Sequence, residues 1–527
     1  MKWISSPLSI SSDPFPCIRS ERGRKYTSAP QTLGGEGKIS LGELENGEMV
    51  QIIRLGLTRT DPPQKVVIVG AGIAGLVAAS LLKDAGHHVK VLEASERIGG
   101  RIRTIHSPFT EGQYMEAGAM RIPESHDLVF EYLRKWGLSV TPFRNETPMD
   151  LIFVNGVRIR QWEYERHPDV LRYPLLPQER GKDSGTLLQR ALWPFLSLYH
   201  RLPLEGKRQL IREMDSYSMD TYLRNNPWGA ILSPGAVEMI KVFWDLEGLA
   251  ENSFLGILEI LALFLDPQLR FYEISGGFER LPEAFWPQLK NEIRLRRQMV
   301  KIRQETKRVM IFTRNQKTGK LEQYEGDTAI VTIPFSVLRW VEVEPRTSFS
   351  HNKWKAIREL HYVPSVKTGL QFKSRFWEQE GHRGGKAVTD LPIRFAFYPN
   401  HGIGSKGPGV VLASYTWEDD AAPWDGLSAD ERILRALENF AQLYGSQVYR
   451  EFVTGSSFSW TRHPWSAGAF SLYKPLQYTQ LYPFISTPEG RVHFAGEHTS
   501  STPSWIEGAI ESGIRVAMEV NGENSQY

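Results

Sequence analysis

The sequence predicts an α/β protein that contains a doubly wound dinucleotide-binding domain and a long helical region. Three observations support this fold class. A strand pattern, a glycine-rich turn and a helix pattern follow one another between Lys65 and Gly86. Residues 160–268 carry long helical patterns and few strand signals. Near the end of the chain, a strand pattern again leads into a glycine and a helix, at residues 491–521.

The first ordered element is a βαβ unit. The apolar stretch KVVIVG, Lys65 to Gly70, has the length of a buried strand. The stretch IAGLVAASLLKDAG has helical spacing and stops at Gly86, and HVKVLE predicts a second strand that ends at Glu93. A strand, a crossover helix and a strand in this order predict a parallel sheet.

The hexamer GAGIAG between this strand and helix has the G-x-G-x-x-G spacing of a dinucleotide site, with glycines at Gly70, Gly72 and Gly75. The first glycine permits a tight turn, the second lets a pyrophosphate approach the backbone, and the third lets the helix pack closely. The free N–H groups of the helix then bind phosphate. Glu93 stands where the ribose hydroxyls need an acid, and an acid there favours FAD or NAD over NADP.

The loop ASERIGGRIRT after Glu93 adds glycines at 99 and 100 and the basic residues Arg101 and Arg103. Two glycines allow a close backbone approach, which suits a large ligand lying extended across the domain. Further strands are predicted by DTAIVTIP, SVKTGLQF, PGVVLASYTW and RVHFAGE. The stretch SWIEGAIESGIRVAMEV places apolar residues on one face of a final helix.

Composition indicates a globular protein. The 527 residues are 41% hydrophobic and 23% charged, and the net charge of +3 does not indicate binding to nucleic acid or to an anionic membrane. The longest apolar run, FLGILEILALFL, contains Glu259 and predicts a buried core helix rather than a membrane span. The single cysteine, Cys17, allows no intramolecular disulfide, and the first thirty residues lack the apolar segment of a secretory signal. We therefore expect a cytoplasmic protein.

Several stretches resemble the flavin-dependent amine oxidases, most closely their L-amino-acid oxidase branch. They are VVIVGAGIAGLVAA, VLEASERIGGRIRT, GAMRIPE, RFWEQEGHRGGKAVTDLPIRF, YPNH and PEGRVHFAGEHTS with WIEGAIESG, within residues 47–521. The resemblance implies a glutathione-reductase-like Rossmann domain for FAD, a mixed-sheet substrate domain and a helical domain. The implied boundaries are 61–103, 269–358 and 486–527 for the FAD domain, 104–160 and 359–485 for the substrate domain, 161–268 for the helical domain and 1–60 for an N-terminal arm.

The same resemblance implies a set of FAD-binding positions. In monoamine-oxidase-like relatives, a cysteine near the position of Ala469 binds the flavin covalently, and no cysteine stands there in this sequence. Non-covalent FAD is therefore implied. The implied contacts are Gly70, Gly72, Ala74, Gly75, Glu93, Ala94, Gly100, Arg101, Gly118, Ala119, Met120, Arg121, Val300, Trp460, Gly496, Glu497, Trp505 and Ile506.

Arg121, in the stretch EAGAMRIP, is by its local sequence no more than an arginine with a buried stem and a solvated head. The resemblance implies that it binds the substrate carboxylate together with Tyr415, because a guanidinium fork can form two parallel bonds with a carboxylate. Lys367 is implied as the catalytic lysine that holds a water near the flavin, although its local sequence suits an exposed strand lysine. The other implied substrate contacts are Phe397, Trp417, Phe470, Ser504 and Trp505.

The implied activity is oxidative deamination of L-amino acids with medium or large apolar or aromatic side chains. Hydride leaves Cα for FAD, the imino acid hydrolyses to a 2-oxo acid and ammonium, and the electrons pass to dioxygen to give hydrogen peroxide. The implied partners are the amino acid, dioxygen and further copies of the chain in a homodimer or larger assembly. We expect no metal, nucleic acid or membrane. One departure is Ser504, where relatives often have glycine or alanine, and another is the lack of histidine between His200 and His351.

Three alternatives stay open. An amine or polyamine oxidase needs no carboxylate clamp, so the pair Arg121 and Tyr415 argues against it. An amino-acid 2-monooxygenase of the tryptophan type shares that clamp, and the sequence does not separate it from an oxidase. A non-catalytic FAD-binding protein has no use for Lys367.

Overall fold

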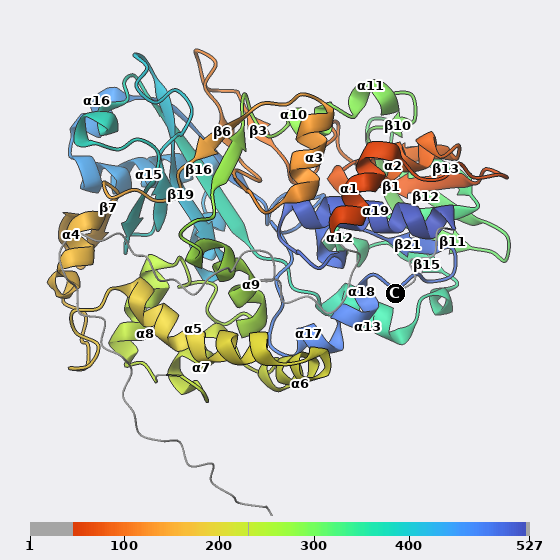
Figure 1. Ribbon diagram of the computed structural model, residues 1–527. Helices are drawn as coiled ribbons and strands as arrows, with labels where there is room; N and C mark the ends of the chain where they lie inside the picture. Colours follow the sequence, from red (N-terminus) through yellow and green to blue (C-terminus); the bar gives the residue numbers. More distant parts are fainter. Residues whose placement is uncertain (1–45, 230, 523–527) are drawn as a thin grey trace, which may run out of the picture. The chain divides into compact units, whose positions relative to one another are not determined.

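A five-stranded parallel sheet forms the centre of the predicted dinucleotide-binding region. The computed structural model describes residues 46–229 and 231–522, all within the compact unit Ser40–Tyr527 (Figure 1). The interior strands read as nearly continuous Val, Ile and Leu, as expected for a parallel sheet that is covered on both faces. In spatial order the strands are β10 (Ile293–Arg294), β2 (His88–Leu92), β1 (Lys65–Val69), β14 (Thr328–Val331) and β21 (Val492–Phe494).

Two helices from opposite ends of the chain lie side by side in this region, α2 (Ile73–Asp84) and α19 (Ile506–Asn521) (Figure 1). A third helix, α1 (Asn46–Leu55), contributes Met49 and Ile53 to the same buried core. Part of the predicted N-terminal arm thus packs with the dinucleotide-binding region. The predictions for residues 1–45, Cys17 included, lie outside the described residues.

A second sheet of four strands continues this region. Its strands are, in spatial order, β13 (Leu321–Gly326), β12 (Val309–Asn315), β11 (Arg297–Gln304) and β15 (Glu342–Glu344). The Arg297 N–H donates to the Glu93 carbonyl at 2.7 Å, so β11 begins beside the end of β2. Strand β11 carries a bulge at Val300, between Met299 and Lys301.

The largest sheet has seven strands and is mixed, because β17 pairs with β7 in parallel while the other neighbours are antiparallel. Its pairing places Lys367 on β16 directly opposite Tyr415 on β19. In spatial order the strands are β20 (Phe452–Ser459), β16 (Ser365–Phe372), β19 (Gly409–Trp417), β18 (Phe395–Phe397), β17 (Lys386–Thr389), β7 (Leu151–Val154) and β8 (Val157–Arg160). Helix α15 (Ala429–Tyr444) contributes Ala436 and Phe440 to the core of this sheet.

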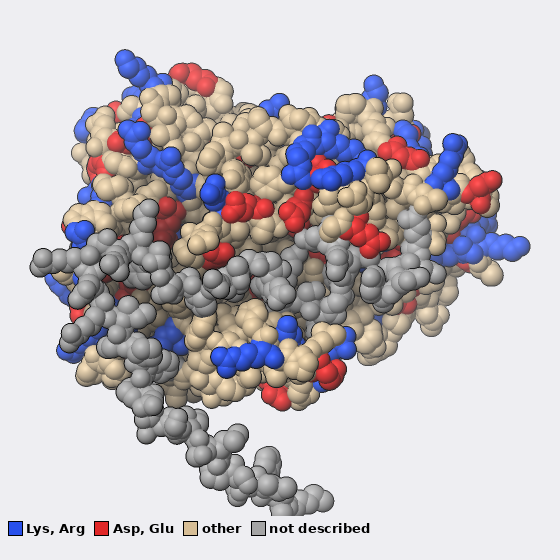
Figure 2. Space-filling view, in the orientation of Figure 1, with Lys and Arg blue, Asp and Glu red and all other residues tan. Residues whose placement is uncertain are grey.

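Between β8 and β9 (Phe271–Ile274) the described residues form helices joined by turns and no named strand, which agrees with the helical pattern of the sequence. Among the described residues no helix is long and apolar enough to cross a membrane. On the face drawn in Figure 2, basic and acidic side chains are interspersed. The main helices of the segment are α4 (Gln161–Arg166), α5 (Ser184–Arg201), α6 (Leu204–Met214), α7 (Met219–Asn225), α8 (Pro234–Phe243) and α9 (Phe254–Leu265).

Short elements connect these sheets. The stretch EAGAMRIP runs from β4 (Met115–Glu116) to β5 (Ile122–Pro123), which pairs with β9. The other short strands are β3 (Thr104–Ile105) and β6 (Val140–Phe143). Further helices are α3 (Asp127–Lys135), α10 (Arg280–Glu283), α11 (Trp286–Leu289), α12 (Phe335–Leu338), α13 (His351–Glu359), α14 (Ala422–Asp425), α16 (Gln447–Glu451), α17 (Gln477–Gln480) and α18 (Tyr482–Ile485).

Candidate active site

The turn between β1 and α2 has the shape that a pyrophosphate requires. A Cβ atom at Gly75 would lie 2.1 Å from the Gly70 carbonyl oxygen, so the close packing of helix on turn excludes any side chain there. A Cβ atom at Gly72 would meet nothing within 4 Å, so this side of the turn is open. No side chain caps the N-terminus of α2 at Gly72, which leaves its N–H groups for an anion. These residues fit the phosphates of a dinucleotide.

Glu93 ends the neighbouring strand, and backbone groups hold its carboxylate. One oxygen accepts from the Ala71 N–H at 2.8 Å and the other from the Ser95 N–H at 2.8 Å. Ala94 and Val300 are both half-buried, and β11, which carries Val300, is hydrogen-bonded to Glu93. The structure therefore brings together the residues predicted for the ribose and adenine end.

The GGR loop folds back onto the turn. Gly99 bridges to Gly72, and a Cβ atom at Gly100 would lie 3.3 Å from the Gly72 Cα. The same loop touches the EAGAMRIP stretch, because a Cβ atom at Gly118 would lie 1.8 Å from the Arg101 carbonyl oxygen. Only glycine permits this crossing of two backbones. The phosphate turn and the stretch predicted to flank the flavin are therefore in direct contact with the same loop.

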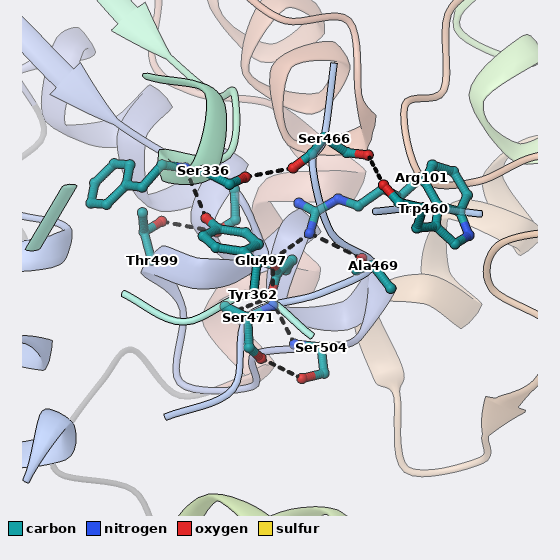
Figure 3. A network of polar contacts seen from close by, with 12 residues as sticks. Arg101, Ser336, Tyr362, Trp460, Ser466, Ala469, Ser471, Glu497, Thr499 and Ser504 are labelled. Atoms are coloured by element: carbon teal, nitrogen blue, oxygen red, sulfur yellow. Dashed lines mark hydrogen bonds and ion pairs between the residues drawn. The ribbon is translucent and has the colours of Figure 1, made fainter. Parts of the chain in front are cut away.

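A buried ion pair joins this loop to the C-terminal part of the chain (Figure 3). Arg101 Nη1 donates to Glu497 Oε1 at 2.6 Å, and Glu497 also accepts from the Ser471 hydroxyl at 2.8 Å and the Ser504 N–H at 2.9 Å. Burial disfavours the charged carboxylate, but Arg101 and the hydrogen bonds outweigh it and hold the pKa of Glu497 below its usual range. Glu497 therefore anchors the GGR loop in the described structure.

The mixed sheet supplies two side chains that hold the backbone of EAGAMRIP. The indole Nε1 of Trp460, which is buried, donates to the Ala117 carbonyl at 2.6 Å. Lys367 Nζ donates to the Gly118 carbonyl at 2.6 Å and to the Glu116 carbonyl at 3.3 Å. The stretch predicted to flank the flavin is therefore held by one side chain of strand β16 and by one that directly follows strand β20.

Lys367 is fully buried, which overturns the expectation from its local sequence of an exposed strand lysine. Its Nζ lies 4.3 Å from the centroid of the Tyr415 ring. Burial lowers the pKa of Lys367 to about 7, although the nearby Glu116 carboxyl opposes the change. Burial likewise raises the pKa of Glu116 to about 8. The site therefore contains a lysine that can exchange a proton near neutral pH.

Arg121 is half-buried, and the side chains in direct contact with its guanidinium are neutral. Its Nη1 donates to Asn145 Oδ1 at 2.8 Å. Its guanidinium carbon lies 4.6 Å from the ring centroid of Phe264 and 5.5 Å from that of Phe397. Within the described ranges it forms no ion pair, and desolvation lowers its pKa to about 10. Its other N–H groups are therefore available to an anionic ligand.

Tyr415 and Trp417 stand beside this guanidinium site. The Tyr415 ring lies 4.5 Å from the Trp417 ring and 6.4 Å from the Phe397 ring, centroid to centroid. Burial raises the pKa of Tyr415 to about 12, so the hydroxyl is neutral and can donate. Together with Phe397, these rings form an aromatic pocket that contains two cationic side chains, Arg121 and Lys367.

Ser504 adopts a left-handed backbone conformation, with φ of +72°. Glycine adopts this conformation without strain, whereas a serine seldom does. The Ser504 hydroxyl donates to the Ser471 carbonyl at 2.8 Å. It is thus engaged with the backbone rather than free to meet a substrate amino group.

The remaining predicted residues occupy the borders of the site. Phe470 is half-buried, and its carbonyl accepts from the Val363 N–H at 2.9 Å. Trp505 occupies the N-cap position of α19 without a side-chain capping bond, and Ile506 begins that helix. Gly496 lies just before Glu497, after the end of β21. Met120 and Phe397 line a hollow of about 510 Å³, counted with the open space at its mouth.

Sequence reasoning missed three side chains of the site. Asn145 follows β6, Phe264 lies near the end of α9, and Asp245 follows α8. None belongs to a motif, and the helix predicted for the apolar run that contains Phe264 gave no sign of a binding role. Only the packing of three distant segments places them around Arg121.

A family model described as "Flavin containing amine oxidoreductase" matches residues 73–521. The chain belongs to this family. As a flavin-containing amine oxidoreductase it uses FAD, and the open turn at Gly72 and the uncapped helix after it fit that cofactor.

Similar proteins of this family include several with the L-amino-acid oxidase name. The provisionally named L-amino-acid oxidase YobN of Bacillus subtilis (strain 168) is 48% identical over 91% of this chain and 99% of its own length. An L-amino-acid oxidase of Siganus canaliculatus is 36% identical over 90% of this chain and 88% of its own length. One from Pseudechis australis is 34% identical over 91% of both chains.

Solved structures of the family agree in fold. A cyclohexylamine oxidase from Brevibacterium oxydans IH-35A has a TM-score of 0.69 and 20% identity, covering 88% of this chain and 99% of its own. A putrescine oxidase redesigned in its cofactor binding has a TM-score of 0.71 and 18% identity, with the same coverage. These likenesses confirm the predicted α/β fold class.

Proposed function

We propose that the protein catalyses the oxidative deamination of L-amino acids with medium or large apolar or aromatic side chains. The products are a 2-oxo acid, ammonium and hydrogen peroxide. The observation that carries the proposal is Arg121, a desolvated cation without an ion-pair partner in the described structure, set between Phe264 and Phe397. The similarity to proteins named L-amino-acid oxidases, at 34–48% identity, supports it.

Arg121 and Tyr415 bind the substrate carboxylate in this proposal. A guanidinium in an apolar pocket attracts an anion more strongly than one in water, because the surrounding medium screens less. The neutral Tyr415 hydroxyl adds a second donor. Asn145 holds one guanidinium nitrogen at 2.8 Å and so fixes the direction of the others.

The bound carboxylate then determines which face of the substrate meets the cofactor. With the carboxylate fixed and the side chain held by Phe397 and Trp417, only one enantiomer directs its Cα–H toward the cofactor. Bound FAD supplies the two-electron chemistry and passes the electrons to dioxygen. Lys367, tied to the Gly118 carbonyl, exchanges a proton beside that site.

The alternatives on this fold are an amine oxidase and an amino-acid 2-monooxygenase. An amine substrate would leave Arg121 unpaired in the pocket, a state that costs free energy. A monooxygenase shares the clamp and differs in its product, an amide formed with loss of carbon dioxide. A homodimer or larger assembly and a cytoplasmic location stay predictions.

A substrate panel with the purified holoenzyme tests this function. Without oxygen, L-amino acids with large side chains should bleach the flavin absorbance, whereas their D-enantiomers and the matching amines should not. With oxygen, the L-amino acids should yield peroxide and 2-oxo acid in equal amounts. Lack of bleaching by every L-amino acid would reject the proposal, and amide in place of 2-oxo acid would identify the monooxygenase.

A further inference from the structure

A carboxyl group beside the candidate active site has no evident partner. Asp245 follows helix α8, is 8% exposed and has a left-handed φ of +54°. Its Oδ2 atom is buried and makes no hydrogen bond within the described part of the chain. Buried carboxyl oxygens are normally hydrogen-bonded or ion-paired, so an oxygen without a partner points to a ligand that is not part of the chain.

The segment that carries Asp245 borders the aromatic pocket. A Cβ atom at Gly248 would lie 2.3 Å from the Trp417 carbonyl oxygen, so this segment packs directly on the end of β19. Burial dominates the pKa of Arg121 and that of Tyr415, and the charge of Asp245 acts on both in the upward direction. Asp245 is therefore electrostatically coupled to both residues of the predicted carboxylate clamp.

Nearby acids outnumber the cations that could neutralise them. Arg394 pairs with Glu247 at 2.6 Å and with Asp420 at 2.7 Å, which occupies both of its terminal nitrogens. Asp245 brings the number of carboxyls around this guanidinium to three. If all three were ionised, these carboxyls would outnumber the guanidinium, so an added cation would stabilise the ionised form of Asp245.

The other charged neighbours of Asp245 do not supply that cation. Lys386 acts on it from a distance, but its Nζ is paired with Glu146 at 3.2 Å. Burial, reinforced by Asp420 and Glu247, raises the pKa of Asp245 well above its usual range. The carboxyl therefore avoids an isolated buried charge by staying protonated, and an incoming cation can take the place of that proton.

We propose that Asp245 pairs with a cationic group at the end of the substrate side chain, so that L-amino acids bearing a distal ammonium or guanidinium are preferred substrates. The inference rests on the proposed oxidative deamination and changes the expected substrate class, from apolar or aromatic side chains to side chains that end in a cation. Arg121 takes the α-carboxylate and Asp245 takes the distal cation, so each charge of the ligand meets its opposite. The aromatic walls at Phe397 and Trp417 then contact the aliphatic stem between them.

L-Arginine and L-citrulline form a matched pair for the test, because they have nearly the same shape and differ in side-chain charge. For the wild-type holoenzyme, kcat/KM for L-arginine should exceed that for L-citrulline roughly tenfold or more, as expected for a charge-assisted bond to a buried group. In the Asp245→Asn variant this ratio should fall toward one. Asp419→Asn is the matched control, because Asp419 is exposed on the neighbouring turn, and its ratio should stay at the wild-type value.

A second pair, L-lysine and L-norleucine, tests the same point in the wild-type enzyme and needs no folded variant. A ratio near or below one for both pairs overturns the proposal, as does an undiminished arginine preference in Asp245→Asn. If L-phenylalanine or L-leucine reacts while both basic amino acids fail, the inference falls and the proposed function stands. If only agmatine, the amine without the carboxylate, is oxidised, both fall.

Discussion

Arg121 is available to a ligand because the side chains in direct contact with it are neutral. Most buried arginines are paired with a carboxylate, but Asn145 and the rings of Phe264 and Phe397 satisfy the guanidinium only in part. Aromatic faces attract a cation without neutralising it. The pocket therefore keeps a positive charge that a substrate carboxylate can meet.

Replacing Arg121 by methionine should lower kcat/KM for L-amino acids, since a charged hydrogen-bonding partner is lost. The loss corresponds to about 2–4 kcal/mol of transition-state stabilisation. Asn145→Ala should have a smaller effect of about 0.5–1.5 kcal/mol, because it loosens the guanidinium without removing it. Steady-state kinetics measure both. Arg144→Met, at an exposed arginine beside Asn145, is the control. Equal kinetics in Arg121→Met and wild type would contradict the clamp.

The protonation of Lys367 should make reoxidation of the reduced enzyme depend on pH. Its pKa of about 7 means that the amine is charged below that pH and neutral above it. A cation beside the cofactor stabilises negative charge that develops on reduced oxygen. Reoxidation of the reduced enzyme should therefore slow as pH rises through about 7, and Lys367→Met should be slow throughout, by roughly 100-fold at low pH. Stopped-flow mixing with oxygenated buffer measures this. If Lys367→Met kept the wild-type pH profile, another group would control the pH dependence of reoxidation.

At the scale of elements, the turn after β1 and the EAGAMRIP stretch use glycine for different reasons. Gly72 leaves space for a ligand, whereas Gly118 leaves space for the backbone of Arg101. The space at Gly72 is needed only when the cofactor binds. The space at Gly118 is needed for the chain itself to fold.

These two roles can be separated by substituting alanine. Gly72 has φ of −70°, which alanine adopts easily, so Gly72→Ala should fold with an unchanged or slightly higher Tm in the flavin-free state yet retain little FAD. Gly118→Ala should lower the Tm with or without FAD, because its Cβ would lie 1.8 Å from a carbonyl oxygen. Flavin absorbance and thermal unfolding report the two effects. Full FAD content in Gly72→Ala would disprove the proposed approach of the pyrophosphate.

At the scale of the whole described chain, the dinucleotide-binding region is assembled from both ends of the sequence. Strand β21 joins the parallel sheet through β14, and α19 lies along α2. The ion pair between Arg101 and Glu497 ties these remote segments together in a site where its members are 20% and 7% exposed. Because this pair is largely buried, breaking it leaves a charge without a partner.

Glu497→Gln should therefore lower the free energy of unfolding by about 3–5 kcal/mol at neutral pH. The pKa of Glu497 is lowered on folding, so its contribution is full above its ordinary value of 4.5 and is lost as the pH falls through the lower folded value. Thermal unfolding between pH 7 and 3 should show a weaker acid dependence in the variant. Glu438→Gln, in an exposed ion pair with Arg435, should change little. An equal Tm for Glu497→Gln and wild type would show that the pair does not stabilise the fold.

Local sequence patterns predicted many of the strands and helices of this protein. The stretch SVKTGLQF is strand β16, Ser365–Phe372, and HVKVLE is strand β2 followed directly by Glu93. The fold class was predicted correctly, because apolar periodicity and glycine spacing are properties of contiguous residues. The family and the FAD cofactor were predicted correctly from the resemblance of longer stretches to the flavin-dependent amine oxidases. The roles of the individual site residues stay predictions, although the structure gathers Arg121, Tyr415 and Lys367 in one place.

The surroundings of those residues were decided by tertiary structure alone. Lys367 has the local sequence of an ordinary strand lysine, and only the pairing of β16 with β19 buries it against Tyr415. Phe264 and Asp245 come from helical segments with no motif, and packing brings them to the same pocket. Desolvation and charge coupling depend on distances between groups that are far apart in the chain, and no local pattern of residue types records those distances.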